Sequence, residues 1–209
     1  MRLLLFPIIQ MIWKPLTSPL VKMSYSVPMP SLPIGVMRLT TDEGTTDYII
    51  CVPLDRVNAA EGRIPAEAVM GVCLTPMQDN EQHVAPENFA PNSYFLDLLH
   101  DVVALHGPST PHLQELAKGI GNGPVFVIDE RTLTPESEVP AEYLIGQFEA
   151  KDGKIVPASY RPNDAYCLLT SDGFIELHPE LEDHLTEALA SIPNVAMPLN
   201  PGRPQNRKN

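Results

Sequence analysis

The sequence contains little cysteine, and its three cysteines are not spaced for a metal site or a redox pair. Cys51, Cys73 and Cys167 cannot all pair with one another, and no Cys-x-x-Cys occurs. Each stands among apolar residues, where a free thiol packs as a small hydrophobic side chain. We therefore expect a chain without disulfides that belongs to a reducing compartment, the cytoplasm.

Basic residues are also scarce. The chain carries 14 Lys and Arg against 26 Asp and Glu, which gives a formal net charge of −12. A surface this acidic repels the phosphate groups of nucleic acids and of anionic lipids. We therefore expect no nucleic-acid partner and no membrane association.

Long hydrophobic runs are missing as well. The most apolar stretch, residues 3–13, is too short to cross a bilayer, and no small-residue cleavage pattern follows it. We expect residues 1–23 to be a poorly ordered N-terminal extension. Residues 194–209 have no apolar periodicity, and we expect them to form a disordered tail.

Proline, in contrast, is abundant, with 23 in 209 residues. Because proline interrupts helices and central strands, this content favours many short elements joined by rigid turns. The length is sufficient for one domain with a sizeable core, or for two small units that share a core.

A duplicated pattern organises the rest of the chain. Residues 55–71 match residues 130–146 at an offset of 75, and residues 86–92 match residues 157–163 at an offset of 71. The paired residues are Arg56/Arg131, Glu61/Glu136, Pro65/Pro140, Ala66/Ala141, Glu67/Glu142, Gly71/Gly146, Pro86/Pro157, Phe89/Tyr160, Pro91/Pro162 and Asn92/Asn163. The pattern indicates two copies of one unit, with four extra residues in a loop of the first copy.

Hydrophobic patterning predicts the elements of each copy. β-Branched and aromatic runs predict strands, Asp-Gly at 152–153 predicts a hairpin, and apolar residues at helical spacing predict helices. The expected strands are 36–40, 48–52, 72–75, 124–128, 143–150 and 154–156. The expected helices are 93–106, capped by Asn92 and closed by Gly107, a short one at 111–118, and one that begins near Pro179.

These elements predict an α+β fold with mostly antiparallel sheet. We expect two tandem strand–short helix–hairpin–helix units packed as one pseudo-twofold domain, since a unit of about 75 residues makes a marginal core alone. The first unit spans 24–107, the connector spans 108–123, and the second unit spans 124–193.

The repeated motif Pro-Ala-Glu-x-x-x-Gly belongs to this architecture. Proline fits the first position of a helix, glutamate in the first turn meets the positive end of the helix dipole, and glycine is the usual left-handed stop. We therefore interpret 65–71 and 140–146 as one-to-two-turn helices rather than as sites of chemistry.

Motifs for metals and cofactors are absent. His100, His106 and His112 have no further ligands at a recognised metal spacing, so we expect no metal site. The glycine-rich stretch 119–123 lacks the Lys-Ser/Thr of a phosphate loop, and no nucleophile motif occurs. We expect no cofactor.

One polar cluster remains as a weak candidate for ligand binding. The second copy gathers a denser group of polar residues than the first, with Asp129 in place of Leu54, Tyr160 in place of Phe89 and Arg161 in place of Ala90. They lie at the ends of strands, where sites are common. Its members are Asp129, Arg131, Ser159, Tyr160, Arg161 and Asn163. The alternative is that these residues only make loop hydrogen bonds and a surface ion pair.

The sequence therefore leaves two functional hypotheses. The first is a non-catalytic binding or protein-interaction module, monomeric or weakly dimeric, with an unidentified protein or small-molecule partner. The second is a small enzyme that acts on a polar or anionic small molecule through the polar cluster. The first is favoured because no catalytic motif is present.

Overall fold

The structure is a computed structural model that describes residues 32–41, 44–52, 64–78, 83–132, 134 and 138–193. The expectations for residues 1–23 and 194–209 lie outside the described residues. Within the described residues, no helix is long and apolar enough to span a lipid bilayer.

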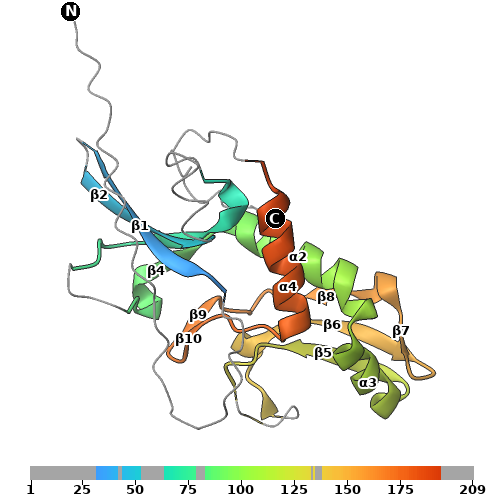
Figure 1. Ribbon diagram of the computed structural model, residues 1–209. Helices are drawn as coiled ribbons and strands as arrows, with labels where there is room; N and C mark the ends of the chain where they lie inside the picture. The colour runs from blue at the N-terminus through green and yellow to red at the C-terminus, as the bar shows by residue number, and fades with distance from the viewer. Residues whose placement is uncertain are drawn as a thin grey trace, which may run out of the picture.

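The fold is α+β, and all of its described strand pairings are antiparallel (Figure 1). The α-helices are α2 (Ser93–His106), α3 (Pro111–Ile120) and α4 (Pro179–Ser191). One sheet has the order β1 (Ile34–Thr41), β2 (Gly44–Cys51), β3 (Val69–Cys73) and β4 (Phe89–Pro91). A second contains β5 (Gly123–Ile128), β6 (Leu144–Lys151), β7 (Lys154–Ile155) and β8 (Arg161–Pro162). A two-stranded sheet pairs β9 (Leu169–Thr170) with β10 (Gly173–Phe174).

Most of the predicted elements are confirmed. The hairpin at 152–153 has positive φ at both turn residues, 52° at Asp152 and 73° at Gly153, as a tight two-residue turn requires. β3 begins at Val69, three residues before the predicted start. The strand starts early because the turn before it, Ala66–Ala68, is a single 3₁₀ turn and not a longer helix. The hairpin formed by β9 and β10 was not predicted, because its strands are only two residues long.

The two larger sheets share the same local irregularity. β2 pairs with β3 through a register shift between Ile49 and Ile50, next to Gly71. β5 pairs with β6 through a register shift between Val127 and Ile128, next to Gly146. The bulge therefore falls at the same distance from the repeated glycine in both sheets.

An asparagine fixes the short turn before the central strand in both sheets. Asn92 and Asn163 each donate from Nδ2 to two backbone carbonyls and accept a backbone N–H two residues further on. The carbonyls are those of Ala66 and Val69 for Asn92, and those of Ala141 and Leu144 for Asn163, all at 2.7 Å. This bonding accounts for the repeated asparagine, because only an amide side chain donates and accepts in this way.

The interpretation of the repeated Pro-Ala-Glu motif as a helix with a glycine stop is wrong in part. The motif forms a single 3₁₀ turn, Ala66–Ala68 in the first sheet and Ala141–Tyr143 in the second, and then enters a strand. Gly71 and Gly146 lie inside those strands and have no positive φ. The motif is still architectural, but its glycine does not stop a helix.

Close packing of an aromatic ring explains the glycine instead. A Cβ at Gly146 would lie 2.6 Å from the hydroxyl oxygen of Tyr160 and 2.7 Å from the carbonyl oxygen of Arg161. A Cβ at Gly71 would lie 2.5 Å from the ring of Phe89. Glycine is required in both strands because a ring covers the position that a side chain would occupy.

Helix α2 begins and ends as predicted, but two details differ. The Asn92 side chain accepts the Tyr94 N–H at 3.2 Å, as a cap should. Gly107 is right-handed, with φ −49° and ψ −44°, because a short 3₁₀ helix (Gly107–Ser109) continues from α2. Leu105, which continues the apolar spacing of Leu98 and Val102, is 73% exposed rather than buried.

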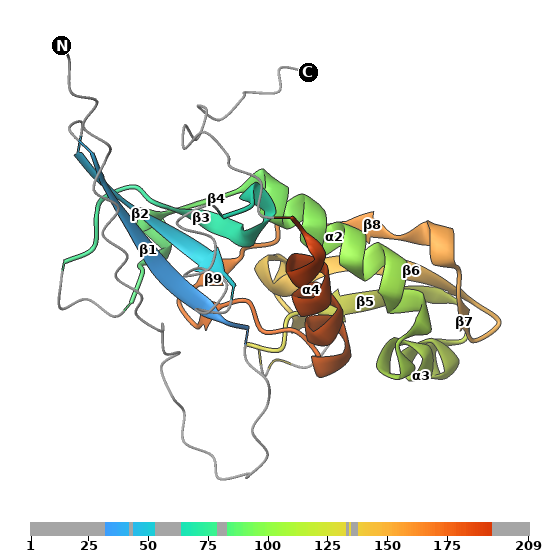
Figure 2. The ribbon, with the colours of Figure 1, turned by 45° about the horizontal axis from the view of Figure 1, so that its top comes forward.

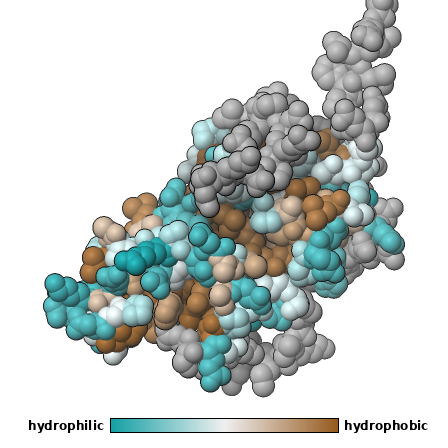
Figure 3. Space-filling view, turned by 180° about the vertical axis from the view of Figure 1, so that it is seen from behind, coloured by the Kyte–Doolittle hydropathy of each residue, from teal (hydrophilic) through white to brown (hydrophobic). Residues whose placement is uncertain are grey.

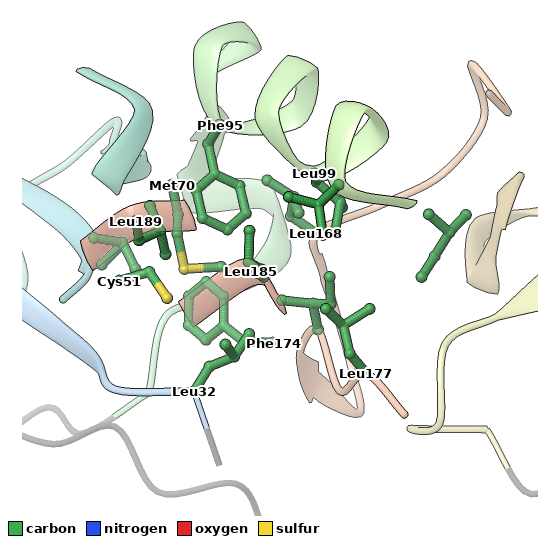
Figure 4. Close-up of a cluster of buried hydrophobic side chains, with 14 of the residues drawn as sticks. Leu32, Cys51, Met70, Phe95, Leu99, Leu168, Phe174, Leu177, Leu185 and Leu189 are labelled. Carbon is green, nitrogen blue, oxygen red and sulfur yellow. The ribbon is translucent and has the colours of Figure 1, made fainter. Parts of the chain in front are cut away.

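Helix α4 joins the two larger sheets through a shared core. It crosses in front of α2 in Figure 2, and Leu181, Leu185 and Leu189 on its inner face are at most 4% exposed. Figure 4 shows Leu185 and Leu189 beside side chains from both halves of the chain, such as Met70 and Leu168. The three leucines contribute about 1.5–3 kcal/mol each to folding by burial.

We predict that Gly146→Ala lowers the free energy of unfolding by at least about 1 kcal/mol, because Tyr160 and the strand beside it must move to admit the methyl group. Gly119→Ala is the matched control, since Gly119 lies in α3 with open space around it. That substitution should be neutral or stabilising by up to about 1 kcal/mol. Urea unfolding of the three proteins measures both effects, and equal stabilities would contradict the packing argument.

Candidate functional site

The six residues of the polar cluster separate into two groups in the structure. Asp129 and Arg131 follow β5 and lie in the interior, with side chains 0% and 1% exposed. Ser159, Tyr160, Arg161 and Asn163 lie in or directly beside β8, the short strand that pairs with β6. They are therefore two structural neighbourhoods rather than one pocket.

The Asp129 carboxylate is fully occupied by partners within the protein. The Arg131 guanidinium binds it with two parallel bonds, from Nε at 2.9 Å and from Nη2 at 2.8 Å. Tyr166 donates its hydroxyl to Oδ2 at 2.7 Å, and the backbone N–H groups of Arg131 and Glu176 donate to Oδ1 at 3.1 Å. Five donors satisfy the carboxylate, which leaves no acceptor site for a ligand.

The remaining donors of Arg131 hold the hairpin of β9 and β10. Nη2 donates to the carbonyl of Cys167 at 2.8 Å, and Nη1 donates to the carbonyls of Leu168 and Gly173. The guanidinium also lies 5.5 Å from the ring centroid of Tyr143, close enough for a cation–π contact. Arg131 thus connects the end of β5 to three points of the later chain.

The protonation states of this group are fixed. Burial opposes the charge on Arg131, but the hydrogen bond and the charge of Asp129 raise the pKa of Arg131 above its ordinary value. Burial and the neighbouring Asp129 charge raise the pKa of Tyr166 well above its ordinary value. Neither group exchanges a proton near neutral pH, so the pair stabilises the fold and supplies no acid or base.

The second group makes backbone and surface contacts. Ser159 Oγ accepts the Glu149 N–H at 2.8 Å and donates to the Val156 carbonyl at 2.6 Å. Arg161 forms an exposed ion pair with Glu149 at 3.0 Å. Together with the two bonds of Asn163 described above, these contacts support the β8 edge of the sheet.

Tyr160 connects this edge to helix α2. Its hydroxyl lies 2.9 Å from Nδ1 of His100, and its ring packs 5.0 Å from that of Phe148. Burial raises the pKa of Tyr160 above its ordinary range and also lowers the pKa of His100. The pair therefore contains a neutral phenol and a histidine that favours the neutral form.

Three exposed carboxylates lie near enough to His100 to act on its charge. The charges of Asp97, Asp101 and Asp164 all act on the His100 ring and oppose part of the lowering of its pKa. All three residues are exposed, and among the described residues none of the three side chains makes a hydrogen bond or an ion pair. We call this group, with His100 at its centre, the acidic face.

The acidic face was visible only in part from the sequence. Asp97 and Asp101 are four residues apart, so helical spacing alone places them on the same side of α2. Asp164 is 60 or more positions further along the chain and is brought beside them by the fold.

Glu182 is buried, although glutamate usually lies at the protein surface. The residue is only 6% exposed, on the inner side of α4. Burial, followed by the nearby charges of Asp183, Glu176 and Glu130, raises the pKa of Glu182 to about 7. Burial and the Glu182 charge also raise the pKa of the Cys51 thiol to about 12, which makes that thiol unreactive.

Cysteines and metal ligands give no further centre in the part of the chain that the structure describes. Cys51 and Cys73 are buried, and Cys167 is exposed, where an apolar environment was expected. No group of three or more His, Cys, Asp or Glu is arranged to hold a metal ion among those residues.

The chain was compared with family models, with curated proteins and with solved structures, and no match was found.

We predict that Arg131→Leu lowers the free energy of unfolding by roughly 3–5 kcal/mol, because it leaves the Asp129 carboxylate buried without its cation. Arg161→Leu is the matched control, since it removes the same kind of ion pair at the surface. Its cost should be below about 1 kcal/mol. Chemical denaturation measures both, and a small loss for Arg131→Leu would exclude the structural role of the buried pair.

We predict that Glu182→Gln stabilises the protein at pH 8 by about 1–2 kcal/mol, with little effect near pH 4.5. The folded pKa of about 7 lies above the ordinary value, so folding is favoured by protonation and loses stability as the pH rises through 7. The amide removes that dependence. Stability measured from pH 4.5 to 8 checks the result, with the exposed Glu142→Gln as control. Parallel pH profiles for wild type and Glu182→Gln would disprove it.

Proposed function

We propose that the protein is a non-catalytic binding protein that holds a positively charged segment of a partner protein against the acidic face. The observation that carries the proposal is the gathering of Asp97, Asp101 and Asp164 around His100 without a neutralising cation in the described structure. Like charges brought together at a surface repel one another, and a bound cation relieves that repulsion.

The internal bonding of the polar cluster favours this hypothesis over the small enzyme. Asp129 and Arg131 satisfy each other and the hairpin beside them, and Ser159 and Asn163 bind backbone groups. A catalytic acid, base or oxyanion donor needs an atom that can reach a substrate. These side chains have used their hydrogen-bonding capacity within the fold.

Helix α2 supplies more than the carboxylates. Tyr94, Asp97, Asp101 and Leu105 follow one another at helical spacing, and Tyr94 and Leu105 are 57% and 73% exposed. α2 runs along the upper side of the molecule in Figure 2. An aromatic ring and a leucine beside two carboxylates fit the apolar stems and charged ends of lysine or arginine side chains.

Charge rather than apolar area would select the partner. On the face seen in Figure 3, hydrophobic residues lie interspersed with hydrophilic ones. The formal net charge of −12 adds a long-range attraction for cations and speeds their association. We also propose that the protein is cytoplasmic, because its three cysteines are unpaired.

We further propose that the two larger sheets are copies of one unit, related by a pseudo-twofold axis. The matched bulges, the matched asparagine bonds and the glycine beneath an aromatic ring support the duplication. The acidic face would then lie where the copies meet. Asn92 begins α2 in the first copy, and Asn163 immediately precedes Asp164 in the second.

The binding proposal predicts that a fluorescent lysine-rich peptide binds the protein more tightly than a glutamate-rich peptide of equal length. The triple variant Asp97→Asn, Asp101→Asn, Asp164→Asn should weaken binding by about tenfold, since three exposed charge contacts contribute roughly 1–3 kcal/mol in total. Fluorescence anisotropy at several salt concentrations measures the affinity and its salt dependence.

The control triple variant carries Glu87→Gln, Glu115→Gln and Glu142→Gln, exposed carboxylates that lie outside the acidic face. It has the same net charge as the first triple variant and should keep most of the affinity. Equal weakening in the two variants would show that binding depends on overall charge and would exclude a defined face. No preference for the lysine-rich peptide would exclude the function itself.

A further inference from the structure

Four of the six histidines of the chain form two stacked pairs that connect α4 to the neighbouring helices. His106, at the end of α2, stacks on His184 of α4 with ring centroids 3.8 Å apart and planes 16° apart. His112, in the first turn of α3, stacks on His178, the residue that precedes α4, at 4.4 Å and 12°. The sequence did not indicate these pairs, because their members are 66 to 78 positions apart.

One carboxylate accompanies each pair. Glu187 of α4 lies close enough to His106 to favour its charged form. Glu180 lies 3.7 Å from Nδ1 of His178, and it also accepts the His112 backbone N–H at 3.4 Å. Nδ1 of His178 is buried and has no hydrogen-bond partner among the described residues. Each pair therefore has one negative charge beside two rings that can each take a proton.

Two stacked rings cannot both be protonated without cost. The carboxylate offsets the first proton, but a second proton places two like charges about 4 Å apart. Protonation of both rings of a pair therefore disfavours the docked position of α4.

We propose that the two histidine pairs act as a proton-sensitive clasp, which keeps α4 docked when the rings are neutral and loosens it when both rings of a pair are protonated. Loosening α4 would expose Leu181, Leu185 and Leu189, which belong to the core shared by the two sheets. Figure 4 shows Leu185 and Leu189 within that core. Because those leucines are shared by both halves of the chain, the clasp regulates how firmly the halves are held together.

The sign of the effect follows from linkage. A histidine whose pKa is lower in the docked state stabilises docking above its free pKa of about 6.5, and that stabilisation is lost as the pH falls below it. The pKa of His106 is lowered, first by burial and then by the charge of His184. A separation of one pKa unit changes the docking equilibrium tenfold.

Glu182 on the same helix acts in the opposite direction. Its raised pKa, about 7, means that α4 docks more firmly as the pH falls from 7 towards the ordinary value of a glutamate. The two responses overlap, so variants are needed to separate them. His106→Gln with His178→Gln removes one ring from each stack, and Glu182→Gln removes the opposing carboxyl.

Hydrogen exchange of the α4 amides, corrected for intrinsic rates, tests the proposal on the full chain between pH 7.5 and 5.0. In Glu182→Gln, protection of residues 181–191 should fall at least tenfold on acidification while that of β5 and β6 falls less. In His106→Gln/His178→Gln, the protection of α4 at pH 5.0 should be equal to or greater than its protection at pH 7.5. His83→Gln, an exposed histidine outside the pairs, should behave as wild type.

The proposal is overturned if α4 keeps its protection at pH 5.0 in Glu182→Gln, or if the double histidine variant loses protection as Glu182→Gln does. Histidine titration by NMR on the wild-type protein gives a second readout that does not depend on the variants folding. The His106 ring should titrate below the ordinary histidine pKa. A His106 titration at the ordinary value would overturn the proposal as well.

Discussion

The ion pair between Asp129 and Arg131 is the interaction on which the second half of the molecule depends. A guanidinium can be buried only when a carboxylate neutralises it and carbonyl groups accept its remaining protons. Both conditions are met, and the carbonyls come from β10 and from the residues just before β9. The backbone of Glu176, just before α4, binds the same carboxylate. The pair thereby fixes the route by which the chain reaches its last helix.

That route determines the core. Because α4 lies between the two larger sheets, its leucines pack against side chains of both. Neither sheet therefore has to bury its apolar face alone. The same helix carries a buried carboxyl, Glu182, and one member of a histidine pair, His184. The proposed sensitivity of its position to protons follows from these two contacts, since the pKa of Glu182 is raised and that of His106, the partner of His184, is lowered.

The candidate site illustrates the limit of comparing residues along a sequence. Polar residues at strand ends suggested a binding cluster, yet Asp129 and Arg131 point inward and Arg161 points to solvent. Residue type alone could not separate these cases, because an arginine serves equally in a buried pair and on a surface. The acidic face on α2 required a residue from the second half of the chain, Asp164, whose proximity no spacing rule predicts.

The sequence by itself determined the local elements. Strand composition, the Asp-Gly turn, the Asn92 cap and the apolar face of α4 are decided by neighbouring residues, and all of them occur in the structure. Only the tertiary structure decided why Gly71 and Gly146 are glycine, where Glu182 lies and which histidines meet. Those properties depend on rings, carboxylates and helices that are distant in sequence, and they exist only when the chain has folded.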